Sequence, residues 1–346
     1  MNITEKINKK ELEELLIQFD INSFGECEMI DSSHGESDIR HNYIIDKKYV
    51  LRINSAKVMT EERIKELNIL IKRYNDFGLK APYYISNVYG AYVLEYNDFY
   101  CYLSEYLDYP LAEGVEEPYK KELFAERIQY ICEFAEQFKD IDLIETLSMY
   151  SLFDLAPYDQ PKGIDEKQEN FDALMLDLKA SGEFELADRL TAAYATDRNE
   201  LRAIYKNLPR CVFQGDENFS NLCVDEESHI IGLFDFNMSG TEVIANYLAN
   251  IAFQGDFDFS EELLEVNSPK EVLELMMNAY YESTKTIQEY YDFSDMEWRA
   301  YELYSRIVLI SGYINTWAYS EFLKSEKHKE KIVELLWLIE NNIKFQ

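Results

Sequence analysis

The sequence predicts an α+β fold in two lobes, an antiparallel sheet with one helix followed by a mainly helical lobe. The chain has 346 residues, more than a single hydrophobic core usually serves. Up to about residue 108, short runs of strand-forming residues alternate with polar turns. Beyond that point apolar residues recur mainly at helical spacing. We therefore expect an N-terminal lobe over 1–108 and a C-terminal lobe over 109–346, with the boundary near Tyr109-Pro110.

The N-terminal lobe is expected to begin with a helix over residues 1–20, which places Leu12, Leu15 and Leu16 on one face. Three strands follow, and short polar connections join them into an antiparallel meander. A second helix is predicted between Thr60, a capping residue, and Gly78, a terminating one. The predicted strands are "ECEMI", "HNYII", "YVLRI" and, after the second helix, "AYVLEY" and "FYCYLSEYL".

The C-terminal lobe is predicted to be helical, including the long charged span 165–207, with one β-rich exception at 211–237. Within that exception, Asp216 is followed five residues later by Asn221, and Asp235 ends the next apolar run. Phosphoryl transfer needs such groups, because one carboxylate must accept a hydroxyl proton while an amide oxygen and a second carboxylate hold Mg²⁺.

Two other interpretations of this segment stay open. A calcium loop would use Asp216, Asn218, Ser220 and Glu227, but Asn221 occupies its sharp-turn position and the flanks are strand-like. An acidic hairpin without any ligand would need none of this chemistry. A second "FQGD" at 253–256 lacks the later residues of the motif and is interpreted as coincidence.

The composition is strongly acidic, with 34 Lys and Arg against 66 Asp and Glu and a formal charge of -32. Such a surface disfavours nucleic acid and anionic membranes as partners, and it concentrates cations, including a cationic substrate. The simpler alternative is that the charge only keeps a Tyr- and Phe-rich chain soluble.

Cysteine usage and the N-terminus bear on location. The five cysteines are scattered without a CxxC pair, which argues against zinc and against a disulfide framework. The first residues do not resemble a signal peptide, and no run approaches the roughly 18 apolar residues of a membrane span. A cytoplasmic protein is expected.

The segment "VFQGDENFSNLCVDEESHIIGLFDF" resembles the aminoglycoside phosphotransferase and choline kinase superfamily, which has a protein-kinase-like fold. The resemblance extends over roughly residues 20–320. It implies that Asp216 is the catalytic base and that Asn221 and Asp235 bind Mg²⁺. It also assigns residues to the nucleotide: Arg52 and its helix partner Glu66 at the phosphates, Ser32, Ser33, Gly35 and Ser37 in the phosphate loop, and the backbone near Glu105 and Leu107 at the purine.

The chain departs from the family pattern at several positions. Gln214 replaces the His of the catalytic loop, Arg52 replaces a Lys, and Asn237 replaces a Gly. Asn246 lies where the family has a further carboxylate, and the phosphate loop has a single glycine, Gly35. The three residues closest to the chemistry are retained, so we expect an active enzyme.

The expected function is Mg²⁺-dependent transfer of the γ-phosphoryl group of ATP or GTP to a hydroxyl of a small molecule. The acidic charge and the aromatic segment "YINTWAYSEF" suit an amine-bearing acceptor such as an aminoglycoside, with Asp256, Asp258 and Trp317 in its pocket. The alternatives are a kinase of choline, an amino alcohol or homoserine, a pseudokinase-like nucleotide-binding module, and a calcium-binding protein. Either a monomer or a homodimer fits the sequence.

Overall fold

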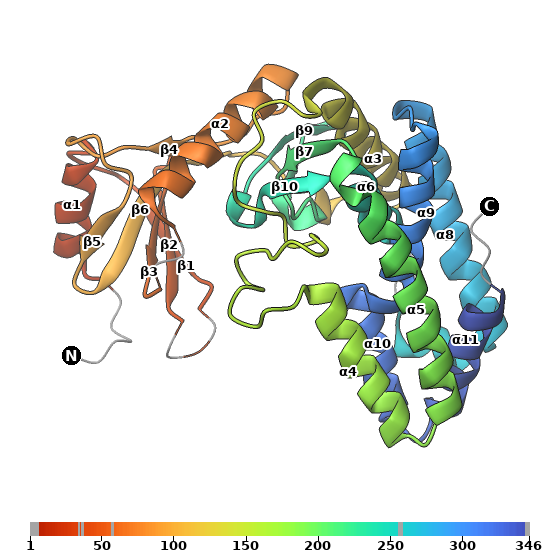
Figure 1. Cartoon of the computed structure of the whole chain (residues 1–346). Coiled ribbons are helices and arrows are strands. Elements are labelled where there is room, and N and C mark those ends of the chain that lie inside the picture. The colour runs from red at the N-terminus through yellow and green to blue at the C-terminus, as the bar shows by residue number, and fades with distance from the viewer. Residues whose placement is uncertain (1–6, 34, 36–37, 57–58, 255–258, 343–346) are drawn as a thin grey trace. The chain divides into compact units, whose positions relative to one another are not determined.

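The computed structural model describes residues 7–33, 35, 38–56, 59–254 and 259–342. The chain divides into two compact units (Figure 1). The first contains Met1–Glu116 and Asp216–Phe236, and the second contains Glu117–Gly215 and Asn237–Gln346. The first unit therefore includes a segment that lies, in sequence, within the predicted C-terminal lobe.

The first unit is built on an antiparallel sheet with the order β1-β2-β3-β6-β4, in which β5 also pairs with β6. Its strands are β1 (Cys27–Asp31), β2 (Arg40–Ile45), β3 (Tyr49–Asn54), β4 (Tyr84–Ile85), β5 (Leu94–Tyr96) and β6 (Phe99–Glu105). The predicted meander and its strand order along the chain agree with this sheet. The two-residue strand β4 was not predicted, because so short a run has no readable alternation.

Two helices complete the sheet unit as the sequence predicts. The helix α1 (Lys9–Gln18) buries Leu12, Leu15 and Leu16 in one cluster with apolar residues of β2, β3 and β6. The helix α2 (Glu61–Phe77) begins where Thr60 Oγ1 accepts a hydrogen bond from the Arg63 N–H, and it ends at Gly78, whose φ is 110°. Side chains buried in this way contribute roughly 1.5–3 kcal/mol each.

The rest of the first unit comes from the β-rich segment near residue 220. The 3₁₀ helix η3 (Phe219–Asn221) leads into the hairpin of β8 (Leu222–Val224) and β9 (Ile230–Leu233). A second 3₁₀ helix of this unit is η1 (Ala112–Gly114). Gly232 and Lys80 form an isolated bridge, and the backbone N–H of Lys80 donates to the Ile231 carbonyl at 2.8 Å, so the hairpin is joined to the chain that follows α2.

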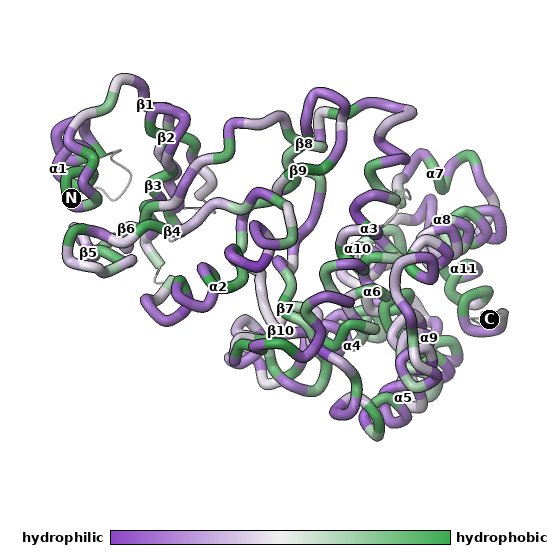
Figure 2. Tube along the Cα trace, turned by 90° about the horizontal axis from the view of Figure 1, so that it is seen from above, coloured by the Kyte–Doolittle hydropathy of each residue, from purple (hydrophilic) through white to green (hydrophobic). Residues whose placement is uncertain are grey.

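The second unit is mainly helical, as predicted. Its most buried helix is α6, which is mainly apolar, is buried on all sides and packs against α8 and α9. Figure 2 shows hydrophobic and hydrophilic residues alternating along helices such as α11. The helices are α3 (Tyr119–Phe138), α4 (Glu166–Ala180), α5 (Phe184–Ile204), α6 (Ile244–Phe253), α7 (Glu261–Val266), α8 (Pro269–Tyr290), α9 (Asp295–Ser311), α10 (Tyr313–Leu323) and α11 (Lys329–Asn342), with 3₁₀ helix η2 (Tyr205–Asn207). Among the described residues, no helix is both long and apolar enough to cross a membrane.

A two-stranded sheet of β7 (Arg210–Phe213) and β10 (Gly240–Val243) lies in the second unit. The sequence did not predict β10. The predicted β-rich segment contributes β7 to the second unit and β8 and β9 to the first. At the end of β7, Gly215 has a φ of 92°, and a Cβ there would clash with the backbone of Met238. Only glycine fits this position, which immediately precedes Asp216.

A buried polar cluster follows β10. Asn246 is fully buried, and its amide nitrogen donates to the Tyr150 carbonyl at 2.7 Å. Beside it lies Glu242, only 2% exposed, whose Oε1 accepts a hydrogen bond from the Val243 N–H at 2.7 Å. A structural carboxylate is therefore present in this region, on the strand rather than at Asn246.

The protonation of Glu242 generates a stability prediction. Burial raises the pKa of Glu242 to about 7 from its ordinary 4.5, although hydrogen bonds with Asn246 and the Val243 backbone oppose the rise. The folded state thus retains a proton that the unfolded chain loses, so stability falls as pH rises from about 4.5 to about 7 and then levels off. The difference corresponds to about 3 kcal/mol. We expect Glu242→Gln to unfold at a higher temperature than the parent at pH 8 and at a similar one at pH 5. Thermal unfolding across this range measures the effect, and a parallel loss of stability in both proteins would contradict it.

Candidate active site

The candidate active site centres on the carboxylate of Asp216, in the loop that precedes β8. Its Oδ1 accepts a hydrogen bond from Asn218 Nδ2 at 2.8 Å, and its Oδ2 accepts one from Asn221 Nδ2 at 2.9 Å. Asn221 Nδ2 also donates to the Asp216 carbonyl at 2.9 Å. Because both carboxylate oxygens are held, the rotamer of Asp216 is fixed before any ligand binds.

The charge on Asp216 is balanced by opposing effects. Burial raises the pKa of this carboxyl above its ordinary value, and the negative charge of Asp235 raises it further. The hydrogen bonds from Asn218 and Asn221 lower it, because they stabilise the charged form. Asp216 is thus more basic than a solvent-exposed aspartate, which favours proton acceptance.

Asp235 follows β9 and has a φ of 59°, in the left-handed region. Strained backbone of this kind is typical of functional sites, although Asp tolerates it better than most residues do. Asn237, the residue at the family's glycine position, lies instead in the 3₁₀ helix η4 (Phe236–Met238). The positive φ therefore falls on the predicted metal ligand itself.

Asn221 contacts Asp216 through its side chain and the residue before Asp235 through its backbone. The carbonyl of Asn221 accepts a hydrogen bond from the Phe234 N–H at 3.1 Å, next to Asp235. The same residue is only 7% exposed and holds Asp216 through its side chain. Because its amide nitrogen is directed at Asp216, its amide oxygen lies on the opposite side of the group.

These residues fit a magnesium ion. Carboxylate and amide oxygens are the protein ligands that Mg²⁺ takes. The negative charges of Asp216 and Asp235 interact unfavourably in this structure, and a divalent cation would relieve that repulsion. The donor chemistry of Asn221 and Asp235 therefore suits the metal that the sequence predicts.

Arg52 lies on β3, opposite Tyr102 of β6, and its Nη1 donates to Ser104 Oγ at 2.8 Å. It also interacts electrostatically with Asp235. Glu66 of α2 lies 3.4 Å from Arg63 Nη1. These contacts do not join Arg52 to Glu66, so the predicted pair between them stays a prediction.

The helix α2 is joined to the catalytic loop by a different side chain. Tyr74 donates its hydroxyl to Oε1 of Glu217 at 3.4 Å, and its ring meets Phe236 edge-on with centroids 5.7 Å apart. Glu217 is a 2% exposed carboxylate directly after Asp216. Neither Tyr74 nor Glu217 was predicted as a site residue, and only the adjacency of Glu217 to the motif could have indicated it.

The predicted phosphate loop connects β1 and β2. Ser33 Oγ accepts a hydrogen bond from the Arg40 N–H at 2.9 Å, and Ser32 Oγ accepts one from Asn42 Nδ2 at 3.0 Å. Gly35 has a φ of 85°, a conformation that glycine adopts readily. Ser37 lies outside the described residues. The two serine hydroxyls therefore connect the start of the loop to β2.

The predicted purine-binding segment follows β6. The Glu105 N–H donates to the Tyr83 carbonyl at 2.9 Å, and the Glu105 carbonyl accepts from Ser104 Oγ at 3.1 Å. The backbone of Leu107 has no hydrogen bond within the described part of the chain. Leu107 is thus better placed than Glu105 to offer backbone hydrogen bonds to a base.

The predicted acceptor residues are only partly described. Asp256 and Asp258 lie outside the described residues. Trp317 of α10 is 58% exposed, and Tyr313 and Ile314 on the same helix are 65% and 56% exposed. The three side chains give the second unit an exposed aromatic and apolar surface.

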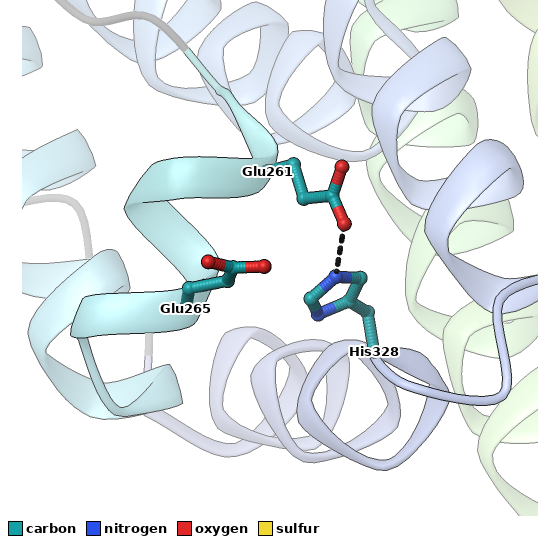
Figure 3. A group of neighbouring side chains, drawn as sticks. All are labelled: Glu261, Glu265 and His328. Carbon is teal, nitrogen blue, oxygen red and sulfur yellow. Dashed lines mark hydrogen bonds and ion pairs between the residues drawn. The ribbon is translucent and has the colours of Figure 1, made fainter.

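A separate group of possible metal ligands lies in the second unit, where His328 faces Glu261 and Glu265 of α7 (Figure 3). His328 Nε2 is 3.0 Å from Glu261 Oε1, and the Lys327 ammonium contacts both carboxylates. The other ring nitrogen of His328 is buried without a partner in the described part of the chain. A metal bound at Nε2 would leave the ring proton on Nδ1, which has no acceptor in the described part of the chain. The group is therefore better explained as an ion-pair cluster.

Comparison with known proteins agrees with this geometry. The profile of the family APH, described as the phosphotransferase enzyme family, matches residues 36–267, more than half of the chain. No curated protein matches the sequence. Among solved structures, the chain is similar to the amicoumacin kinase hAmiN in complex with AMP-PNP, Ca²⁺ and Ami, at 12% identity over 96% of each chain with a TM-score of 0.51.

A second similar structure is the aminoglycoside phosphotransferase from Alicyclobacillus acidocaldarius subsp. acidocaldarius DSM 446, at 11% identity over 97% of this chain and 98% of that chain, with a TM-score of 0.50. At such identities the likeness concerns the fold, and it confirms the predicted kinase-like α+β class. Because the family profile covers more than half of the chain, from β2 through the catalytic loop and the Asp235 segment, the chain belongs to the phosphotransferase enzyme family and is a small-molecule kinase with a hydroxyl acceptor.

Proposed function

We propose that the protein transfers the γ-phosphoryl group of ATP or GTP to a hydroxyl of a small, amine-bearing molecule, in a Mg²⁺-dependent reaction. The observation that carries the proposal is the arrangement of Asp216, Asn221 and Asp235. The amide side chain of Asn221 holds the Asp216 carboxylate, and its backbone carbonyl accepts a hydrogen bond from Phe234, the residue before Asp235. In this proposal, residues 1–108 form the nucleotide-binding lobe, and 109–346 supply the catalytic loop and the acceptor pocket.

Asp216 is the proposed general base. Its two oxygens accept amide hydrogen bonds from Asn218 and Asn221, and a carboxylate offers about four acceptor sites, so it can also accept a proton from an incoming hydroxyl. Accepting that proton as the hydroxyl oxygen attacks the γ-phosphorus is worth on the order of 10²–10⁴ in rate. The rest of the rate enhancement would come from positioning and electrostatic stabilisation.

Asn221 and Asp235 are the proposed Mg²⁺ ligands, and the bound ion would neutralise charge on the phosphates of the donor. Arg52 would add a fixed positive charge toward those phosphates, since Ser104 holds its guanidinium. Glu66 is proposed to act with it. Backbone groups near Ser33, Gly35 and Ser37 would cover the phosphates, and Glu105 and Leu107 would flank the base.

An amine-bearing acceptor, such as an aminoglycoside, is supported by the formal charge of -32 and by exposed aromatic side chains on α10, which can bind cations through their ring faces. Trp317, Asp256 and Asp258 are the proposed contacts. Choline, an amino alcohol or homoserine would satisfy the same chemistry. A screen of these compounds with ATP and GTP, read as phosphate mass gain, tests the proposal. The proposal would be contradicted if a neutral or anionic alcohol were phosphorylated and no hydroxylated amine were.

The first prediction concerns the base. Asp216→Asn preserves the size of the side chain but removes proton acceptance, so we expect turnover to fall at least about 10²-fold. Nucleotide binding, measured as the thermal shift with Mg-ATP, should persist. The same chemical change at the exposed turn residue Asp98 serves as control and should leave turnover unchanged. Equal turnover of parent and Asp216→Asn would exclude Asp216 as the base.

The second prediction concerns Asn218, whose amide lowers the pKa of Asp216. Removing that hydrogen bond in Asn218→Ala raises the pKa of Asp216, so the acid limb of the kcat/KM profile should move to higher pH. Ser220→Ala is the matched control, because Ser220 contacts Asn218 but not Asp216. An acid limb that stays in place, or moves to lower pH, would show that Asn218 does not tune the base.

The third prediction concerns the metal. In Asp235→Asn one negative ligand is lost, so we expect the Mg²⁺ concentration that gives half of the nucleotide-dependent thermal stabilisation to increase about tenfold or more. Asp98→Asn again serves as the control. Unchanged Mg²⁺ dependence would remove Asp235 from the metal site, whatever happens to activity.

A further inference from the structure

A cavity of about 510 Å³ lies in the second unit, between α4 and α5. Its inner wall is apolar and aromatic: Phe171 and Tyr194 are buried and stack face to face with centroids 3.8 Å apart, and Met175 is 5% exposed beside them. Its exposed edge includes Ala195 and Arg202. A cavity of this size, with an apolar and aromatic wall beside polar and charged side chains, can hold a small organic ligand.

Charges on α5 are sorted between its two sides. The acidic residues Asp197 and Glu200 form two-bond ion pairs with Arg306 and Arg299 of α9, with N–O distances of 2.7–2.9 Å. Two basic residues of α5, Arg198 and Arg202, line the cavity. The helices α4 and α5 thus place three basic side chains, Lys179, Arg198 and Arg202, at the cavity of a protein that is acidic as a whole.

The cations at the cavity differ in how they are engaged. Arg198, 8% exposed, is held by both oxygens of Asp165 at 2.5 and 3.0 Å and also donates to the Tyr194 hydroxyl. Arg202 lies over the Phe153 ring, 4.6 Å from its centroid, and forms no ion pair within the described residues. Arg202 is therefore the guanidinium that a ligand can engage.

The remaining charges do not cancel this one. Lys179 lies near the C-terminal end of α4, and its Nζ is 4.0 Å from Asp188 Oδ1. Asp172 is the single acidic lining residue, against the three basic ones Lys179, Arg198 and Arg202. The cavity therefore combines a flat apolar wall with excess positive charge, which is complementary to an aromatic anion.

We propose that the α4–α5 cavity binds an aromatic carboxylate or sulfonate, with its rings against Phe171, Met175 and Tyr194 and its anionic group on Arg202. This ligand class differs from the cationic acceptor proposed for the kinase reaction. None of its lining residues is among those proposed above for phosphoryl transfer.

The test uses two fluorescent probes that share one scaffold, 8-anilino-1-naphthalenesulfonate and its neutral analogue N-phenyl-1-naphthylamine, with the full chain. We expect the sulfonate to bind more tightly than the neutral probe. Arg202→Gln should weaken the sulfonate about tenfold and leave the neutral probe unchanged, as expected for one lost charge-assisted hydrogen bond. Ala195→Phe, which fills the cavity from an exposed position, should weaken both probes more than tenfold.

Matched variants on the same helix serve as controls. Arg189→Gln removes a guanidinium that pairs with Glu340, and Ala193→Phe adds the same ring at an exposed position outside the cavity lining. Neither should change binding. The proposal would be overturned if the sulfonate did not bind, or if its binding survived Ala195→Phe. It would also be overturned if Arg202→Gln had no effect, or if the control variants weakened binding equally. If Ala195→Phe fails to fold, the comparison of Arg202→Gln with Arg189→Gln still decides it.

Discussion

The hydrogen bonds of Asn221 are the constraint on which the candidate site depends. Its side chain holds the Asp216 carboxylate and carbonyl, and its backbone carbonyl accepts from Phe234, beside Asp235. A typical hydrogen bond contributes about 1 kcal/mol, and an unsatisfied buried group costs more. The larger effect here is geometric, because a single buried residue links the proposed base to the neighbour of the proposed metal ligand, 19 positions along the chain from that base.

The strained elements of the site lie beside this constraint. The close approach at Gly215 and the left-handed backbone of Asp235 flank the loop and the hairpin at the positions where the chain passes between the two units. Such conformations persist only where the surrounding contacts outweigh them. Here the β8–β9 hairpin, its bridge to Lys80 and the Tyr74–Glu217 contact are the interactions that hold the segment within the first unit.

The sequence predicted those parts of the structure that depend on local patterns. The leucines of α1, the capping Thr60 and terminating Gly78 of α2, and the meander of β1 to β3 follow from spacing alone. The pairing of β7 with β10 and the inclusion of 216–236 in the first unit depend on contacts distant in sequence. Within the site, Asp216, Asn221 and Asp235 were recognisable as a motif. Asn218 acts through a local contact two residues from Asp216, whereas the contact of Tyr74 with Glu217 is a tertiary one that no spacing encodes.

The departure at Asn246 has a physical explanation in Glu242. A carboxylate at both positions would bury two like charges side by side, which raises one pKa strongly and destabilises the charged pair. With an amide at 246, the side chain can donate to Tyr150 and interact with Glu242 without repulsion, and Asn250 in turn donates to its oxygen at 3.1 Å. One carboxylate and two amides therefore form the buried cluster next to β10. An amide at 246 is compatible with the buried carboxylate of Glu242, so this departure from the family pattern does not by itself indicate a degenerate enzyme.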